Sequence, residues 1–265
     1  MGLRLLTPPA SAGVQWMREG LRDFWRQPLG FASLFVTFML VAQLLGLVPL
    51  LGAPLALAGV PLLSLAYMMA GHRVSLGGLA QPQVFLAPWQ SPALTRQRLI
   101  TLCLLYAGLC LLCLRALDWL DGGEFVRQMD HLAEASARPD GLPPDMLTNG
   151  TAAEGMLLRV AATTLLGLPF WHAPALVLWA GQSVAQALFS STIALWRAKA
   201  AFLTFGVAWL GAMLAASVLL SVMGAVISGT FAVLLMVPLG LMLIGAFQTS
   251  MYPTYRDCFG APEAH

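Results

Sequence analysis

The chain has 265 residues, of which 58% are hydrophobic and 10% are charged, whereas an ordinary soluble domain is about 45–50% apolar and about 25% charged. This composition excludes a soluble globular domain and predicts an all-α integral membrane protein, because several apolar runs approach the roughly 20 residues that cross a bilayer core. The net charge of +2 carries little information by itself, but the distribution of the charges does.

Six apolar runs are predicted to span the membrane within a single membrane domain, 1–265. Links that are short and uncharged join the first run to the second and the fifth to the sixth, so the runs are expected to pair as three hairpins. Longer polar segments occupy 72–98, 120–155 and 181–200. The six predicted spans are 29–48, 50–71, 99–119, 156–180, 201–223 and 225–251.

The basic residues predict the orientation. Ten of the fourteen lie in the N-terminal arm, the 72–98 and 181–200 links and the tail 252–265, whereas eight of the twelve acidic residues lie between Asp118 and Glu154. Basic segments stay on the cytoplasmic side of a membrane. We therefore expect a bacterial inner-membrane protein with both termini in the cytoplasm and an acidic periplasmic loop, 120–155.

Two amphipathic segments precede spanning runs. In 13–27, Arg18, Arg22 and Arg26 recur every fourth residue, and Trp16 and Phe24 fall mainly on the other side. This pattern is typical of a helix in the membrane interface, with Arg toward anionic headgroups and Trp at headgroup level.

A weaker copy of this pattern runs through 183–199 and contains Arg197 and Lys199. The two segments align, with Phe24-Trp25-Arg26 opposite Leu195-Trp196-Arg197. The alignment indicates an internal repeat and two interfacial helices. Lipid-headgroup contacts are predicted for Arg18, Arg22, Arg26, Arg197 and Lys199.

Prolines recur near the middle of alternate spans. Pro61, Pro169 and Pro238 lie in the second, fourth and sixth spans, and Pro174 follows in the fourth. A proline inside a helix removes one backbone hydrogen bond. We therefore expect kinked even-numbered helices at equivalent positions, in agreement with the repeat.

The Trp171-His172 pair is the candidate intramembrane site. Ionisable residues at membrane depth are costly and suggest function, so His172 could line a site near the midplane. A neutral imidazole donating to a carbonyl freed by Pro169 or Pro174 would instead be a structural element. No Asp or Glu lies in the central part of any span, which counts against a proton relay.

Other residues suggest chemistry less strongly. The carboxylates and the imidazole of the outer loop could bind a metal ion or hydrolyse a substrate, but its prolines and mixed charges are also typical of a solvated loop. Cys110 and Cys113 have dithiol spacing inside an apolar run, where cysteine behaves as a small hydrophobe. No phosphate-binding loop or nucleophile elbow occurs. We expect no catalytic residue, no metal and no cofactor. The outer-loop carboxylates and imidazole considered above as metal-binding or hydrolytic groups belong to Asp118, Asp121, Glu124, Asp130 and His131.

Several motifs resemble a family of bacterial inner-membrane proteins of this length that has no assigned activity. They are the 13–28 segment with Trp16 and Phe24, the Trp171-His172-Ala173-Pro174 stretch, the 190–202 segment, and Tyr255-Arg256-Asp257-Cys258-Phe259. Family members often carry Arg-Asn and Pro-Phe where this chain has Arg197-Ala198 and Ala201-Phe202. The resemblance implies a six-helix topology and no mechanism.

Three functions are compatible with these patterns. The leading hypothesis is a non-catalytic inner-membrane protein that acts through anionic lipids, a protein partner or a homo-oligomer, or in envelope maintenance. The alternative is a transporter of small solutes or lipids, with kinked helices around Trp171 and His172. A membrane enzyme is third. Nucleic acid is not an expected partner.

Overall fold

A computed structural model describes residues 5–136 and 150–262, and within these ranges the protein consists of helices and connecting turns without strands. Six helical stretches there are long and apolar enough to span a membrane, which confirms the predicted all-α, six-helix class. These are Pro28–Gly46, Gly52–Ser75, Ala93–Leu120, Ala153–Ala180, Lys199–Val226 and Leu234–Phe259.

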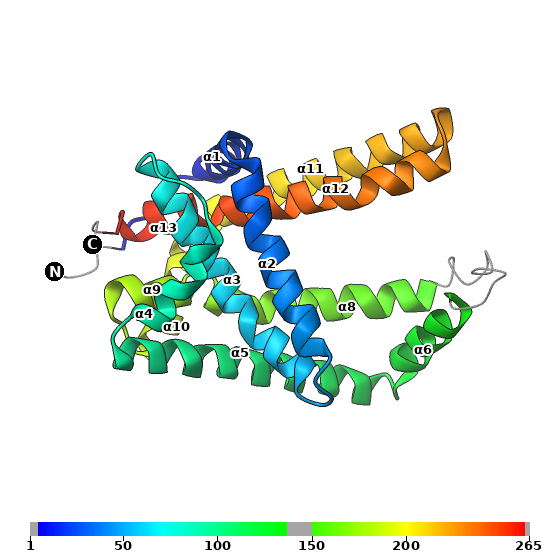
Figure 1. Ribbon diagram of the computed structural model, residues 1–265, viewed down its shortest axis with the longest axis horizontal. Helices are drawn as coiled ribbons and strands as arrows, with labels where there is room; N and C mark the ends of the chain where they lie inside the picture. The colour runs from blue at the N-terminus through cyan, green and yellow to red at the C-terminus, as the bar shows by residue number, and fades with distance from the viewer. Residues whose placement is uncertain (1–4, 137–149, 263–265) are drawn as a thin grey trace.

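The long helices form three arms that diverge from a common base (Figure 1). Helix α2 (Pro28–Gly46) packs along α3 (Gly52–Ser75), α5 (Ala93–Leu120) contacts α8 (Gly150–Gly167), and α11 (Lys199–Val226) packs along α12 (Gly229–Thr249). A further helix, α6 (Glu124–Ser136), closes the far end of the second arm. The equivalence of these pairs as an internal repeat stays a prediction.

Shorter helices gather where the arms meet, and we call them the hub. They are α1 (Ala12–Arg26), α9 (Ala173–Ala180), α10 (Val184–Arg197) and α13 (Met251–Phe259). Both ends of the described chain lie at the hub (Figure 1), where the Leu6 N–H donates to the Cys258 carbonyl at 2.9 Å. The segments predicted to be rich in basic residues therefore lie together at one end of the molecule.

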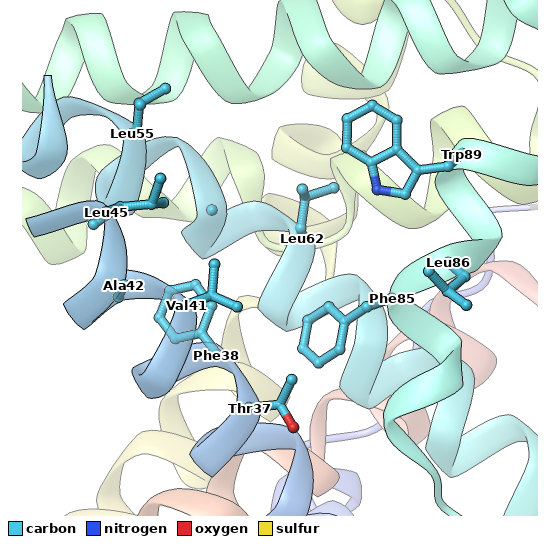
Figure 2. Close-up of a pocket in the computed structure, with 12 residues that line it drawn as sticks. Thr37, Phe38, Val41, Ala42, Leu45, Leu55, Leu62, Phe85, Leu86 and Trp89 are labelled. Atoms are coloured by element: carbon cyan, nitrogen blue, oxygen red, sulfur yellow. The ribbon is translucent and has the colours of Figure 1, made fainter. Parts of the chain in front are cut away.

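The arms expose much apolar surface. Only 11% of the residues in the most apolar windows of α2 and α11 are buried, as expected for helices that lipid surrounds. Beside the first arm, the short helix η1 (Pro82–Leu86) packs against α2 and α3, the short helix α4 (Ala87–Gln90) packs against α5, and an apolar groove lies between them and the arm (Figure 2).

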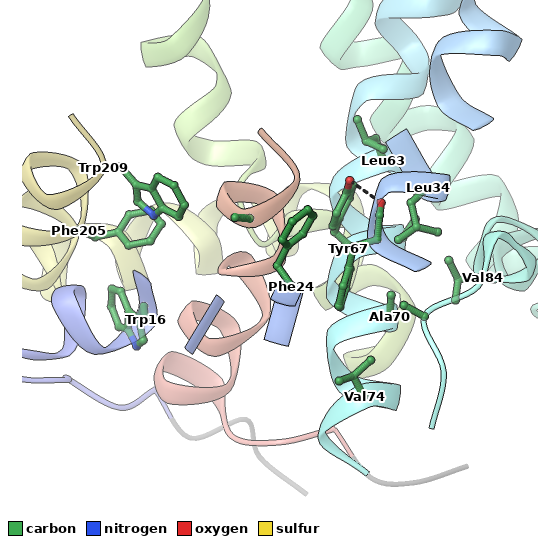
Figure 3. Close-up of a cluster of buried hydrophobic side chains, with 14 of the residues drawn as sticks. Trp16, Phe24, Leu34, Leu63, Tyr67, Ala70, Val74, Val84, Phe205 and Trp209 are labelled. Carbon is green, nitrogen blue, oxygen red and sulfur yellow. Dashed lines mark hydrogen bonds between the residues drawn. The ribbon is translucent and has the colours of Figure 1, made fainter. Parts of the chain in front are cut away.

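Helix α1 packs into the protein. Its Gly13 faces the backbone of α11 and its Gly20 faces Ser250, both at distances that leave no room for a Cβ. Trp16 is fully buried against Phe202 and Phe205, and Figure 3 shows it in the same cluster as Phe205 of α11. The Trp16 ring therefore contacts protein and not lipid headgroups, because an amphipathic sequence pattern does not distinguish a lipid surface from a protein partner, and its depth in the membrane stays a prediction.

The same cluster extends to the base of the first arm. The Tyr67 hydroxyl donates to the Phe31 carbonyl at 2.9 Å (Figure 3), and the two rings stack. The Gln27 side chain donates to the Gly78 carbonyl and accepts from the Ala80 N–H, so it ties the start of α2 to the turn after α3. These bonds hold α2, α3 and the turn after α3 together at the base of the first arm.

The segment predicted as a tail, 252–265, is part of the core up to Phe259. Helix α13 continues from α12 after a break at Ser250, and seven of its nine residues are buried. Its Tyr252, Arg256 and Asp257 lower the hydropathy of the sequence, but their polar groups are bonded inside the hub. The sixth span therefore reaches beyond the predicted limit at residue 251.

The prolines are not equivalent. Helix α3 continues through Pro61 and α12 continues through Pro238, whereas the fourth span is interrupted at Pro169. There the α-helix ends at Gly167, a 3-10 turn η2 (Leu168–Phe170) follows, and Pro174 lies in the first turn of α9. At these prolines the helix is therefore interrupted in the fourth span alone, where two of them converge, and the kinks expected at Pro61 and Pro238 inside continuous helices stay a prediction.

Candidate functional site: the helix break in the hub

The Thr254 hydroxyl group joins both Trp171 and His172, at the break between α8 and α9, to α13. The Thr254 Oγ1 of α13 lies 3.2 Å from the Trp171 Nε1 and 3.0 Å from the His172 Nε2, and it donates to the Met251 carbonyl at 2.7 Å. A hydroxyl has one hydrogen and two lone pairs. All three contacts are satisfied when both rings donate to Thr254, which assigns the His172 hydrogen to Nε2.

His172 is therefore a tether between helices. It has no water-accessible surface, and three aromatic rings surround it, those of Phe202, Tyr255 and Phe259. Its backbone N–H, left free at the start of α9, donates to Ser191 Oγ of α10 at 3.1 Å. In this setting the imidazole fastens α9 to α13, and its backbone fastens α9 to α10.

The other ring nitrogen of His172 has no hydrogen-bond partner in the described part of the chain. With the hydrogen on Nε2, Nδ1 is a buried acceptor that no donor reaches. An unpaired buried polar group typically costs about 1–3 kcal/mol. The sequence hypothesis of a neutral imidazole fits this geometry, but the acceptor is a threonine hydroxyl and not a carbonyl freed by proline.

Helix α10 lies against the break through small side chains. Ala187, Ser191 and Ala194 are its buried residues, and this spacing places them on one face that approaches α9 and η2. Ser183 and Gln186 form a reciprocal cap at its start, as in a capping box. Gly181, with a φ of 62°, turns the chain between α9 and α10.

A second polar network connects α13 to α1. Arg256 Nη1 lies 3.0 Å from Glu19 Oε2, and the Trp16 Nε1 donates to Asp257 Oδ2 at 2.8 Å. On the other side of α13, the Tyr252 hydroxyl lies 2.9 Å from the His72 Nδ1 of α3. The sequence did not predict these pairings, and Glu19, His72 and Tyr252 were not among the predicted site residues. The Tyr255 to Phe259 motif was the available signal, although nothing in its spacing indicated the partners.

Two cavities meet at Trp171. One of about 330 Å3 lies between α3, α5, α8 and α12, and its lining includes the polar side chains of Ser64, Tyr106, Thr163, Thr164 and Gln248. The other, of about 640 Å3, opens between α8, α10 and α11 and has Lys199 and Trp196 at its edge. Trp171 borders both cavities, whereas His172 is buried behind it. Of the predicted pair, Trp171 alone is placed to touch a ligand.

The predicted headgroup contacts face outward. Arg18, Arg22 and Arg26 are exposed along the free side of α1, and the Arg22 and Arg26 side chains lie 3.5 Å from Asp23. The single carboxylate of Asp23 therefore neutralises only part of the positive charge of these three arginines. Arg197 and Lys199 are exposed at the α10–α11 junction, with the Lys199 Nζ 5.1 Å from the centre of the Trp196 ring.

The acidic residues at the far end of the second arm form ion pairs. Arg159 Nη2 lies 2.6 Å from Asp118 Oδ1 and 2.7 Å from Asp121 Oδ2. The hydrogen bond from Arg159 lowers the pKa of Asp121, and Arg127 likewise lowers the pKa of Glu124. Among the described residues no group of three His, Cys, Asp or Glu could hold a metal ion. Part of the predicted loop, 137–149, lies outside the described residues.

Comparison with known proteins identifies a relative of nearly the same length. A protein of Burkholderia thailandensis named as a probable inner membrane protein is 31% identical to this chain over 264 residues, which cover 98% of this chain and 96% of the relative. No protein-family model matches the chain, and no solved structure matches it. The chain therefore belongs to the family of this probable inner membrane protein, as the resemblance of its sequence motifs implied.

Proposed function

We propose that the protein is a non-catalytic component of the bacterial inner membrane that holds anionic lipid against its hub. Both termini and the hub face the cytoplasm in this proposal. The observation that carries it is the arrangement of α1, whose glycine and tryptophan face is packed into the core while Arg18, Arg22 and Arg26 point outward.

Electrostatics supports lipid as the partner of this surface. Glu19 is engaged by Arg256, and Asp23 is shared between Arg22 and Arg26, so the exposed side of α1 keeps a net positive charge. Each basic residue near an anionic membrane surface contributes about 1 kcal/mol of attraction. Arg197 and Lys199 would extend the same surface. A protein partner or a second copy of the chain could dock there also, whereas nucleic acid is not proposed.

Lipid analysis of the protein in native nanodiscs tests the proposal. Replacement of Arg18, Arg22 and Arg26 by Gln should lower the enrichment of anionic lipid around the protein. The matched control replaces Arg115 and Arg127, which lie toward the opposite end, by Gln and should leave the enrichment unchanged. Equal enrichment in all three proteins would refute the proposal.

The second candidate function is transport of a small solute or a lipid, and the cavities on either side of Trp171 favour it. Discontinuous helices beside a cavity are a feature of transporters. To distinguish the two functions, Thr164→Cys, which lies in both cavities, can be treated in proteoliposomes with a charged thiol reagent added from either side. A transporter predicts labelling from both sides, and a sealed hub predicts labelling from neither or from one.

A further inference from the structure

Figure 2 shows the apolar groove beside the first arm, where side chains of α2 and α3 face those of η1 and α4. A cavity of about 280 Å3 lies there, and a second of about 330 Å3 continues from it to α5. The two cavities share six lining residues, so they form one elongated groove between the first arm and α5. The shared residues are Val41, Leu45, Leu55, Gly59, Leu62 and Trp89.

The lining is apolar apart from two residues. One is Arg96, in the first turn of α5, which borders the groove. From Arg96 the groove continues along α5 past Ile100 to Leu104, which is about 12 Å at 1.5 Å per residue. Thr37 is the other polar residue in the lining. A long apolar channel with a cation at its mouth matches a molecule that has an anionic head and a hydrocarbon tail.

The charge of Arg96 has no counterpart in the described part of the protein. Its side chain is exposed and makes one long contact, 3.4 Å from Nη1 to the Trp89 carbonyl. Within residues 5–136 and 150–262, no carboxylate lies at ion-pair distance from it, in contrast to Arg159 and Arg256. A guanidinium group is suited to bind a phosphate through two parallel hydrogen bonds.

We propose that this groove binds one acyl chain of an anionic phospholipid, with its phosphate on Arg96. The occupant is a single acyl chain, because the lining along α5 is apolar over about 12 Å and carries a cation, Arg96. Trp89 and Phe85 form the wall contributed by α4 and η1, so the bound lipid would hold these short helices against the first arm. This site is separate from the basic face of α1.

The test uses the full chain in nanodiscs that contain phosphatidylglycerol with a photoreactive diazirine in one acyl chain. Crosslinks should concentrate on the groove residues of α2, α3 and α5, such as Val41, Leu62 and Ile100. The same diazirine chain on phosphatidylcholine should label these positions several-fold less. Uniform labelling of all the lipid-facing helices, or equal labelling by the two headgroups, would refute the site.

Variants separate the phosphate contact from the groove and from the α1 surface. Arg96→Gln should weaken retention of phosphatidylglycerol in native mass spectrometry about tenfold, as expected for loss of a charge-assisted pair. Arg73→Gln removes an exposed arginine at the same end outside the groove and should leave this retention unchanged.

Ala58→Phe should fill the groove and abolish groove labelling while labelling of α11 persists. Unchanged retention in Arg96→Gln would contradict the phosphate contact.

Replacement of Arg18, Arg22 and Arg26 by Gln distinguishes lipid binding at the basic face of α1 from lipid binding in the groove. These substitutions should leave groove labelling intact, even where they lower the general enrichment of anionic lipid. If groove labelling fell together with that enrichment, the groove would be filled from the α1 surface and would not be a separate site.

Discussion

The hub and the arms of this protein are held by different interactions. In the hub, short helices approach without a gap at Gly13 and Gly20, and polar side chains such as Thr254 connect one helix to the next. In the arms, leucines and valines point outward, with Leu40 and Val218 more than half exposed. The hub is specified by individual contacts, whereas the arms depend on general hydrophobicity and on lipid.

Substitutions should therefore have larger effects in the hub than on the arms. On an arm, lipid replaces a lost side chain without leaving a cavity or an unpaired group. In the hub, a substitution either creates a clash or leaves a buried donor without its acceptor. Matched changes in the two regions should therefore have effects of different size.

The largest contrast is expected between two glycines. Gly20→Leu would place a side chain against the backbone of Ser250 and should detach α1, at a cost of roughly 3 kcal/mol or more, with loss of folded protein. Gly211→Leu on α11 meets open space and should be neutral. Size-exclusion profiles and thermal unfolding in detergent measure both. Equal tolerance of the two substitutions would contradict the close packing of α1.

The next effect concerns the central hydroxyl. Thr254→Val keeps the shape of the side chain but leaves the ring N–H groups of Trp171 and His172 without an acceptor, which should lower stability by about 2–4 kcal/mol. Thr254→Ser should retain most of the stability. As a control, Thr192→Val removes an exposed hydroxyl that bonds only its own helix. A thermal shift equal to that of the control would show that Thr254 is not a shared acceptor.

His172 should behave as a tether. His172→Ala removes a buried ring and its hydrogen bond, at an expected cost of about 2–3 kcal/mol, whereas the Gln side chain can still donate to Thr254 and should recover part of the loss. Unfolding measurements on the two variants check this order. A loss of lipid binding or transport in His172→Gln at unchanged stability would point instead to a ligand-contacting role.

The smallest expected effect lies at the far end of the second arm. Arg159 lowers the pKa of Asp121, so this carboxyl stabilises the fold above its unfolded pKa, and the contribution disappears as the pH falls through the lower folded pKa. Thermal stability should therefore decrease toward about pH 3. Arg159→Met should be less stable at neutral pH and should lose this pH dependence at Asp121. An identical pH profile in wild type and variant would rule the ion pair out.

Hydropathy and charge were sufficient to predict the all-helical class and the six spans, because these properties depend on composition over long windows. Hydropathy and charge did not predict the position of polar residues whose hydrogen-bonding groups are paired with other parts of the protein. Tyr252, Arg256 and Asp257 were assigned to a tail, although their bonds to His72, Glu19 and Trp16 place them in the hub. The partners lie up to 241 residues away in the sequence, so no local pattern could indicate them.

The candidate site was predicted in part. The Trp171-His172 pair was identified by its prolines and by its unusual polarity, and the structure places it where the fourth span is interrupted, whereas the helices around Pro61 and Pro238 continue. The sequence could not indicate which of the two residues borders the cavities. It also could not identify Thr254 as their common acceptor, since a threonine in an apolar setting has no distinctive pattern.

Hydrogen–deuterium exchange of the protein in nanodiscs tests most directly whether α13 is the centre of the hub. The amides of Met251–Phe259 should exchange as slowly as those of α12, and Thr254→Val should speed their exchange together with that of the amides of Ala173–Ala180. Gly211→Leu should change neither segment. Rapid exchange across Met251–Phe259 in the wild-type protein, as in a free tail, would contradict the placement of α13 at the centre of the hub.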